Sequence, residues 1–286
     1  MSNKIIISSD STSDLSKELI ERYNIKTIPL KITLDDKAYI DGVEITPDDI
    51  YLHHEKTGQL PKTTATNIDE CLEYFKDLTK DGNTVIHFSI SSEMSSTYNN
   101  SRLAAEEVDN VYVIDSRNLS TGIGLLMIKA AQMAKETDNA EQIVEEIKAT
   151  IPLVDASFVI DSLEYLYKGG RCSALSVLGA NLLKLKPCIE VKDGVMGVSK
   201  KYRGKYISTL IEYANDRLSE IDNIEPDRVF ITHAGCDDEV VNTIVEEVKK
   251  KNYFSEIFVT RAGCTVSSHC GRNTLGVLYI KKSHNK

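Results

Sequence analysis

The sequence predicts an α/β protein of two domains, with a parallel sheet in the N-terminal domain and a mixed sheet in the C-terminal domain. Three observations support this fold class. Short apolar runs alternate with helix-like segments, which is typical of parallel strands joined by helical crossovers. The chain of 286 residues is longer than one hydrophobic core usually supports. The pattern also changes after Pro152, so we expect domains over residues 1–153 and 154–286.

The N-terminal half consists of repeated units of strand, polar turn and helix. Apolar runs predict the strands, and helical spacing after Ser, Thr or Asp predicts the helices. The expected strands cover 5–7, 28–34, 85–90 and 111–115, with a hairpin return over 38–43. The expected helices cover 15–23, 68–78, 98–108 and 140–149, and two more begin at Pro47 and after the turn that starts at Asp115. In such sheets ligands bind beyond the carboxyl ends of the strands, where the polar turns converge.

The C-terminal half predicts a different order of elements. Gly169-Gly170 ends a short helix as a C-cap does, and Asp193-Gly194 is a strong signal for a two-residue hairpin. The expected strands cover 156–160, 188–191, 195–199, 228–232, 256–260 and 275–280. The expected helices cover 163–167, 175–185, 207–221 and 238–250.

The composition is that of an ordinary soluble globular protein, with 41% hydrophobic and 27% charged residues. No apolar run approaches the ~20 residues of a membrane span, and the N-terminus turns polar too early for a signal peptide. We therefore expect a cytoplasmic protein without a membrane span. The six cysteines form no C-x-x-C pair, so we expect reduced thiols.

The charge is unevenly distributed. The formal net charge of −9 argues against a nucleic-acid partner. Residues 168–205 nevertheless hold nine basic and two acidic residues, a local charge of +7 that leaves about −16 for the rest. This basic segment is either solvated surface or the contact for an anionic ligand or acidic partner. Lys168 and Arg171 flank the turn at Gly169-Gly170 and are the residues we expect to contact a partner.

Hydroxyl groups cluster after the predicted strand at 85–90. Ser92, Ser95, Ser96 and Thr97 lie where a helix is expected to begin. Helix N-termini carry unpaired N–H groups and a partial positive charge, so these residues are either simple N-caps or part of an anion site. No G-x-G-x-x-G motif or P-loop lysine is present, and a bound nucleotide is disfavoured.

His269 lies in a run of small polar residues before the last strand, which we expect to be a turn facing a cleft. No nucleophile-elbow motif accompanies a histidine. A zinc site is a further alternative, because several soft ligands occur in the second half; they are His233, Cys236, Cys264, His269 and Cys270. Their spacing matches no zinc pattern, so no metal or other cofactor is expected.

Several segments together resemble the DegV family, whose members serve as the fatty-acid-binding subunit of bacterial fatty acid kinase. The matching segments span nearly the whole chain. They are DSTSDL at 10–15, KTT at 62–64, ISSEMSSTY at 90–98, VIDSRNLSTGIG at 113–124, LEYLYKGGRCS at 163–173, KLKP at 184–187 and SSHCGRNTLG at 267–276.

The resemblance implies a long-chain fatty acid in a tunnel between two α/β domains, with its carboxylate held by hydroxyl groups. The carboxylate-binding residues of the family match Thr63, Ser95, Arg203 and His269 of this sequence. It departs from the family pattern at Ala65-Thr66, where a proline is usual, and at 270–273, where the family has Thr-Gly-Pro-Gly.

Two functions from different classes follow. In the first, the protein is a carrier that presents a fatty acid to a separate ATP-dependent kinase, which makes the acyl phosphate. In the second, it is a self-sufficient hydrolase or phosphotransferase that uses Ser95 and His269. The missing nucleotide loop and the missing third member of a triad favour the carrier.

Overall fold

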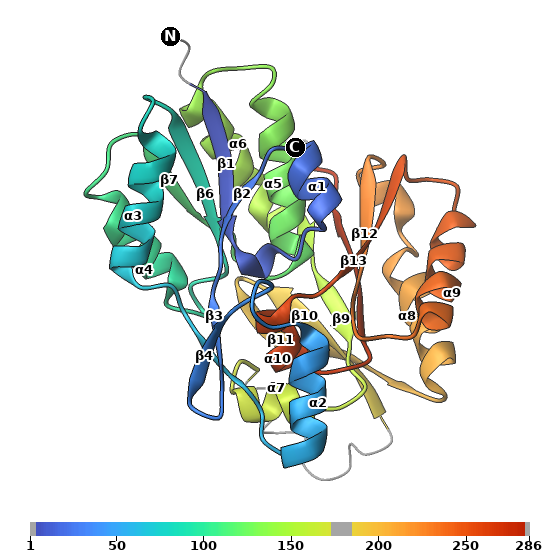
Figure 1. Ribbon diagram of the computed structural model, residues 1–286. Helices are drawn as coiled ribbons and strands as arrows, with labels where there is room; N and C mark the ends of the chain where they lie inside the picture. The colour runs from blue at the N-terminus through green and yellow to red at the C-terminus, as the bar shows by residue number, and fades with distance from the viewer. Residues whose placement is uncertain (1–3, 173–184, 284–286) are drawn as a thin grey trace.

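The computed structural model describes residues 4–172 and 185–283. Within these residues the chain forms three β-sheets, of four, seven and three strands (Figure 1). The first sheet belongs to the N-terminal half, and the second to the C-terminal half. This arrangement confirms the predicted fold class, a mixed α/β protein with a parallel first sheet.

The first sheet is parallel throughout, as predicted. Its strand order is β2-β1-β6-β7, with β1 (Ile5–Asp10), β2 (Lys26–Ile28), β6 (Thr84–Ser89) and β7 (Val111–Asp115). The helices around it are α1 (Lys17–Arg22), α3 (Ile68–Thr79), α4 (Thr97–Ala105), α5 (Thr121–Met133) and α6 (Ala140–Thr150). Almost all of β6 is buried, because helices cover both faces of the sheet. Helix α5 lies between the first and second sheets (Figure 1).

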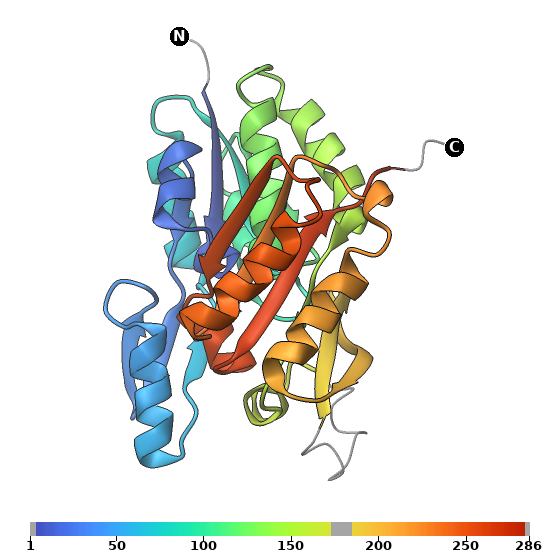
Figure 2. The ribbon, with the colours of Figure 1, turned by 90° about the vertical axis from the view of Figure 1, so that its right-hand side faces the viewer.

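The second sheet is mixed. Its strands are β8 (Val154–Asp155), β9 (Ser157–Val159), β10 (Leu185–Lys192), β11 (Val195–Arg203), β12 (Arg228–Ala234), β13 (Glu256–Arg261) and β14 (Thr274–Ile280). Only β12 and β13 pair in parallel. Helices α8 (Tyr206–Arg217) and α9 (Asp238–Lys249) cover one face (Figure 2). The predicted hairpin at Asp193-Gly194 is confirmed, since both residues have positive φ and Lys192 pairs with Val195.

The third sheet was expected only in part, as the hairpin return over 38–43. The strand predicted over 28–34 is wrong, because the chain divides there between two sheets. After β2, Pro29 interrupts the pairing, and the backbone of Leu30 bonds to Ser11 and Asp41 rather than to a strand. Then β3 (Lys31–Leu34) pairs with β4 (Lys37–Ile40) and with β5 (Lys62–Thr64).

Helix α2 (Pro47–Thr57) packs beside this third sheet and begins where predicted (Figure 1). The Thr46 hydroxyl accepts a hydrogen bond from the Asp49 N–H, and the Asp49 carboxylate accepts one from the Thr46 N–H. Proline at the first helical position completes a favourable N-terminus. The third sheet and α2 together form a small lobe, residues 31–64, which extends below the first sheet in Figure 1.

Two further predictions about the C-terminal half differ from the structure. Most of the helix expected over 175–185 lies outside the described residues, but Leu185 belongs to strand β10. The turn expected around His269 is instead helix α10 (Cys264–Cys270). This segment has no side-chain cap of its own, and its helix N-terminus is satisfied by carboxylates from the N-terminal half. The sequence around His269 contains no sign of these distant caps.

One large hydrophobic core crosses the position where we expect the domain boundary. It includes Ile7 and Phe88 of the first sheet together with Phe158 and Leu278 of the second. Helix α5 joins the two groups, because ten of its residues are buried. The two sheets are therefore closely packed, and a cavity at their junction is enclosed by residues from both halves.

Candidate ligand-binding site

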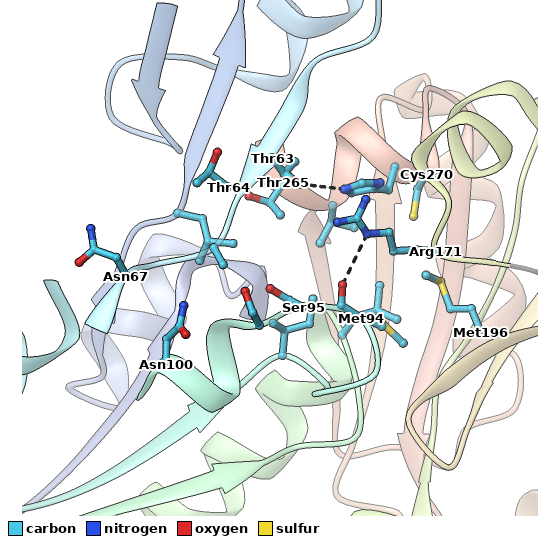
Figure 3. Close-up of a pocket in the computed structure, with 17 residues that line it drawn as sticks. Thr63, Thr64, Asn67, Met94, Ser95, Asn100, Arg171, Met196, Thr265 and Cys270 are labelled. Carbon is cyan, nitrogen blue, oxygen red and sulfur yellow. Dashed lines mark hydrogen bonds between the residues drawn. The ribbon is translucent and has the colours of Figure 1, made fainter. Parts of the chain in front are cut away.

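A cavity of about 370 Å³ lies where the small lobe, the β6–α4 loop and α10 meet (Figure 3). This volume falls in the range of about 300–1,000 Å³ that is usual for small-molecule sites. The polar lining residues are Thr63, Thr64, Asn67, Ser95, Ser96, Asn100, Arg171, Thr265 and His269. The apolar ones are Leu30, Ala65, Ile90, Met94, Leu119, Met196, Val266 and Cys270. The cavity thus combines hydroxyl, amide and basic groups with an apolar wall.

Thr63 and His269 are in direct contact in this cavity. The Thr63 Oγ1 atom lies 2.9 Å from His269 Nε2, and each residue comes from a different half of the chain (Figure 3). Among the described residues, the His269 Nδ1 atom has no hydrogen-bond partner, and it lies against Gly169, where a Cβ would collide with it. Glycine at 169 is therefore needed for the close approach of α7 (Glu164–Gly169) to α10.

The imidazole of His269 is neutral at pH 7. Burial and the nearby positive charge of Arg171 lower its pKa to about 4, with burial the larger cause. A neutral ring can donate from one nitrogen only. If Nε2 carries the proton, it donates to Thr63, and the Thr63 hydroxyl proton is then directed elsewhere, toward the cavity.

Ser95 lines the same cavity and also has a structural role. Its hydroxyl accepts a hydrogen bond from the Thr97 N–H at 3.2 Å and lies 2.8 Å from Thr97 Oγ1. Ser95 therefore satisfies an N–H at the first residue of α4, although the N-cap residue is Ser96, whose side chain makes no capping hydrogen bond. Two of the four clustered hydroxyl residues, Ser95 and Ser96, also face the cavity.

Arg171 is part of the cavity, although the sequence assigned it to a partner surface. Its guanidinium donates to the Gly169 carbonyl at 2.7 Å and to the Met94 carbonyl at 3.5 Å (Figure 3). The residue is exposed on its outer side, so it lies at the rim. Arg171 lies two residues after Gly169, the glycine that contacts His269.

Lys168 does not share this position. Its Nζ lies 2.7 Å from the Glu164 carboxylate on the same helix, and about half of its side chain is exposed. It is not among the residues that line the cavity. Lys168 therefore remains a surface residue, whereas Arg171 can contact both the ligand and the solvent.

Arg203 is not brought to this cavity. It is exposed at the end of β11, paired with Leu185, and does not line the cavity. The opposite end of β11 supplies Met196, and at about 3.3 Å per residue the two positions are roughly 20 Å apart. The predicted strand ends at Ser199, whereas β11 continues to Arg203 and places Met196 and Arg203 far apart.

A second, smaller cavity lies next to the first one, on the side of α5 and the second sheet. It measures about 30 Å³ and shares Leu119, Val266 and Cys270 with the larger cavity. Its remaining lining is mostly apolar and includes Phe158 and Leu278 of the second sheet. The site therefore has a polar end near Thr63 and an apolar end between α5 and the second sheet.

Two of the cysteines considered as zinc ligands instead contact backbone carbonyl groups. Cys236 Sγ lies 3.3 Å from the Thr274 carbonyl, and Cys264 Sγ lies 3.2 Å from the Ile45 carbonyl. All six cysteines are buried. Among residues 4–172 and 185–283, no group of three or more His, Cys, Asp or Glu side chains is arranged to hold a metal ion. In the same residues, no helix is both long and apolar enough to cross a membrane.

The fold and the site define an α/β protein with a cavity of mixed polarity between two packed sheets. The family model described as "Uncharacterised protein, DegV family" matches residues 4–282. The chain belongs to the DegV family, as the resemblance predicted.

Similar proteins and structures cover almost the full chain. A DegV domain-containing protein of Caldanaerobacter subterraneus is 36% identical over 283 residues, which are 98% of this chain and 99% of that protein. A solved structure described as fatty acid binding of a DegV family protein from Thermus thermophilus has a TM-score of 0.91 and 25% identity, covering 98% and 100%. DegV of Bacillus subtilis, described as a fatty acid binding protein, has a TM-score of 0.85 and 29% identity with the same coverage.

Proposed function

We propose that this protein binds a long-chain fatty acid and presents its carboxylate to a separate ATP-dependent kinase, which forms the acyl phosphate. The carboxylate lies at the polar end of the cavity, beside Thr63, Ser95, Arg171 and His269. The acyl chain extends past Leu119 and Val266 into the apolar end. The fatty acid thus occupies a tunnel between the two halves of the chain.

The observation that carries this proposal is the contact between Thr63 Oγ1 and His269 Nε2 in a cavity that shares wall residues with a smaller, apolar one. With the proton on Nε2, neutral His269 donates to Thr63. The Thr63 hydroxyl then donates to a carboxylate oxygen. This chain of two hydrogen bonds favours an acceptor-only group, which an ionised carboxylate is.

Arg171 adds a positive charge at the rim of the same cavity. A carboxylate that leaves water needs charge or hydrogen-bond partners, because an unpaired buried charge is costly. Hydrogen bonds to a charged group contribute about 1.5–3 kcal/mol each. Thr63, Ser95 and Arg171 can therefore offset the desolvation of the head group.

The acyl chain supplies most of the affinity. Burial of a methylene contributes about 0.8 kcal/mol, so ~14 methylenes contribute of the order of 10 kcal/mol before the cost of association. The inner cavity of about 30 Å³ is too small for such a chain in this conformation. Side chains along the tunnel, such as Leu119 and Phe158, therefore move when the ligand binds.

Structural relatives support the choice of ligand. The proteins from Thermus thermophilus and Bacillus subtilis are described as binding fatty acids. A related protein from Eubacterium ventriosum is described as binding stearic acid, and its structure has a TM-score of 0.85. Close similarity of fold over nearly the whole chain is consistent with a shared ligand class.

The kinase partnership rests on the family resemblance and on the exposed charge near the cavity. Lys168 lies on the surface three residues from Arg171, so a partner that contacts Lys168 would be close to the head group. An acidic partner would be attracted to this region, which lies within the basic segment 168–205. The partner itself is identified only by the reaction, ATP-dependent phosphorylation of a carboxylate.

The described contacts favour the carrier over the hydrolase. In a catalytic triad, a carboxylate orients the histidine and the histidine accepts the serine proton. Here His269 Nδ1 faces Gly169 and has no hydrogen-bond partner in the part of the chain that the structure describes, and Nε2 contacts Thr63 rather than Ser95. Ser95 instead contacts Thr97.

Mass spectrometry of an organic extract from the purified protein tests the proposal. We expect one or a few fatty acids at close to one equivalent per chain. The isolated protein should hydrolyse neither ATP nor an acyl ester. No extracted lipid, together with no binding of added fatty acid, would refute the carrier; ester turnover that Ser95→Ala abolishes would support the hydrolase.

A further inference from the structure

The N-terminus of α10 is capped by carboxylates from a distant part of the chain. Its N-cap residue is Gly263, which has no side chain to accept the free N–H groups. Asp41 accepts hydrogen bonds from the Cys264 N–H at 2.9 Å and from the Thr265 N–H at 3.1 Å. Asp14 accepts one from the Gly263 N–H at 2.8 Å. The helix that carries His269 is thus held by the N-terminal half.

Asp41 also contacts the cavity wall directly. One of its carboxylate oxygens accepts from the Thr265 hydroxyl at 2.7 Å, and Thr265 lines the cavity. The same oxygen accepts from the Ser11 hydroxyl at 3.1 Å, and Ser11 in turn accepts from the Leu30 N–H at 3.1 Å. Leu30 lines the cavity as well. Asp41 therefore connects two walls of the site through buried and partly buried hydrogen bonds.

The backbone of Asp41 joins the same group of contacts. Its N–H donates to the Leu30 carbonyl at 3.0 Å, and its side chain is almost completely buried. Asp41 directly follows β4, in the small lobe that supplies Thr63 through β5. A single carboxylate thus links the lobe that carries Thr63 to the helix that carries His269.

We propose that Asp41 is a positioning residue of the head-group site, which holds α10 against the small lobe so that His269 meets Thr63. This inference rests on the proposed function. Four residues of α10 line the cavity, namely Thr265, Val266, His269 and Cys270. Because a helix moves as a unit, loss of its cap displaces all four. The hydrogen-bonding groups at the polar end are then no longer correctly placed around the carboxylate, whereas the apolar wall tolerates small shifts.

The test compares a fatty acid with its methyl ester of the same chain length. A merely destabilised protein binds both ligands less well, but a displaced head-group site loses its preference for the acid. We measure the preference as the dissociation constant of the ester divided by that of the acid. We expect Asp41→Ala to lower this ratio at least tenfold, while affinity for the ester changes less than threefold. Asp41→Asn, which keeps one acceptor oxygen and the shape of the side chain, should lie between Asp41→Ala and wild type.

Asp48→Asn is the matched control. Asp48 also joins the small lobe to the second half, through Arg261 at 3.0 Å, but it caps no residue of α10 and lines no part of the cavity. Its variant should keep the wild-type ratio. If Asp41→Asn and Asp41→Ala both keep that ratio, Asp41 does not position the site.

A ligand-free measurement separates this inference from the proposed function. The imidazole ¹⁵N signals of His269 report its hydrogen bond to Thr63, and we expect them to shift in Asp41→Asn but not in Asp48→Asn. If the wild type shows no preference for acid over ester, the head-group assignment fails, and these signals still decide the role of Asp41. Unchanged signals in Asp41→Asn overturn the inference. If Asp41→Ala does not fold, Asp41→Asn alone carries both measurements.

Discussion

Thr63 Oγ1 lies 2.9 Å from His269 Nε2, although 206 residues separate them in the chain. The contact joins β5 of the small lobe to α10 of the second half. A ligand bound there touches both halves, so it stabilises their association as well as its own site. Binding should therefore raise the melting temperature. Once the ligand concentration exceeds the dissociation constant, this rise should grow with the logarithm of the concentration.

Thr63→Val should weaken fatty-acid binding about tenfold to a hundredfold. Valine has nearly the same shape but cannot donate to the carboxylate, and a hydrogen bond to a charged group is worth about 1.5–3 kcal/mol. Isothermal titration calorimetry with a delipidated protein measures the change. Thr243→Val is the control, because the Thr243 hydroxyl bonds only to Glu239 within α9. Equal affinity of Thr63→Val and wild type would place the carboxylate elsewhere.

Much of the fold could be predicted from local patterns. Local sequence is enough to predict three features, because each depends on neighbouring residues. They are the buried strand β6, the capped start of α2 and the hairpin at Asp193-Gly194. The division of 28–34 between two sheets has one local sign, Pro29, but it also depends on tertiary hydrogen bonds of Leu30. Such bonds between distant residues leave no local pattern.

The same distinction applies to the site. The sequence and the resemblance indicated Thr63, Ser95 and His269, and all three line one cavity. Arg171 was expected on a partner surface and lies at the rim, whereas Arg203 was expected in the site and lies at the far end of β11. Charge alone shows that a basic residue is present. Its position depends on strand length and chain direction, which the hydrophobic pattern fixes only approximately.

Lys168 and Arg171 should have separable effects. Arg171→Gln removes a positive charge from the cavity rim, so we expect fatty-acid affinity to fall about fivefold or more. Lys168→Glu lies outside the cavity and should leave that affinity unchanged. It should instead slow acyl-phosphate formation in a system reconstituted with the kinase, most clearly at low salt, where screening is weakest.

The control for this pair is Lys148→Glu, since Lys148 is similarly exposed and pairs with Glu145 within α6. It should change neither measurement. Normal kinase-coupled turnover of Lys168→Glu at low salt would contradict the docking role of this residue. Normal fatty-acid affinity of Arg171→Gln would show that the rim charge does not contact the carboxylate.

Because His269 is buried, the free energy of unfolding should depend on pH. Burial lowers its pKa in the folded protein from 6.5 to about 4, so between these values the unfolded chain takes up a proton that the folded one does not. The free energy of unfolding therefore falls as the pH decreases through this range, by about 1–2 kcal/mol for a side chain that keeps some contact with water. Above pH 6.5 the imidazole is neutral in both the folded and the unfolded chain, so the full free energy of unfolding is retained.

Urea denaturation at pH 7 and pH 4.5 measures this dependence. His269→Gln lacks the titrating group and should lose less stability on acidification than wild type. Other buried groups, such as His87, whose pKa is lowered to about 3, contribute equally to both proteins and cancel in the comparison. Identical losses in the two proteins would show that His269 is not held neutral by burial.

The last prediction concerns the hairpin between β10 and β11, whose tip contacts the first half beside the cavity. The Ser91 hydroxyl donates to the Gly194 carbonyl at 2.8 Å, and the Arg117 guanidinium donates to the Asp193 carbonyl. Two residues after the turn, Met196 lines the cavity. These two contacts therefore hold one wall of the site in place.

Gly194→Ala should disturb that wall. The added Cβ would lie 2.6 Å from Ser91 Oγ and 2.7 Å from the Arg117 guanidinium, at a φ of +81° that alanine rarely adopts. We expect a lower melting temperature and a several-fold loss of fatty-acid affinity by calorimetry. Gly197→Ala is a matched control on the same hairpin, since its Cβ would have no heavy atom of the described residues within 4 Å apart from its chain neighbours, and it should bind normally. If Gly194→Ala lowers stability but binds fatty acid as well as Gly197→Ala does, the hairpin tip contributes to folding alone. Equal melting temperatures for the two variants would show instead that the hairpin tip can accommodate the added Cβ without weakening its contacts with Ser91 and Arg117.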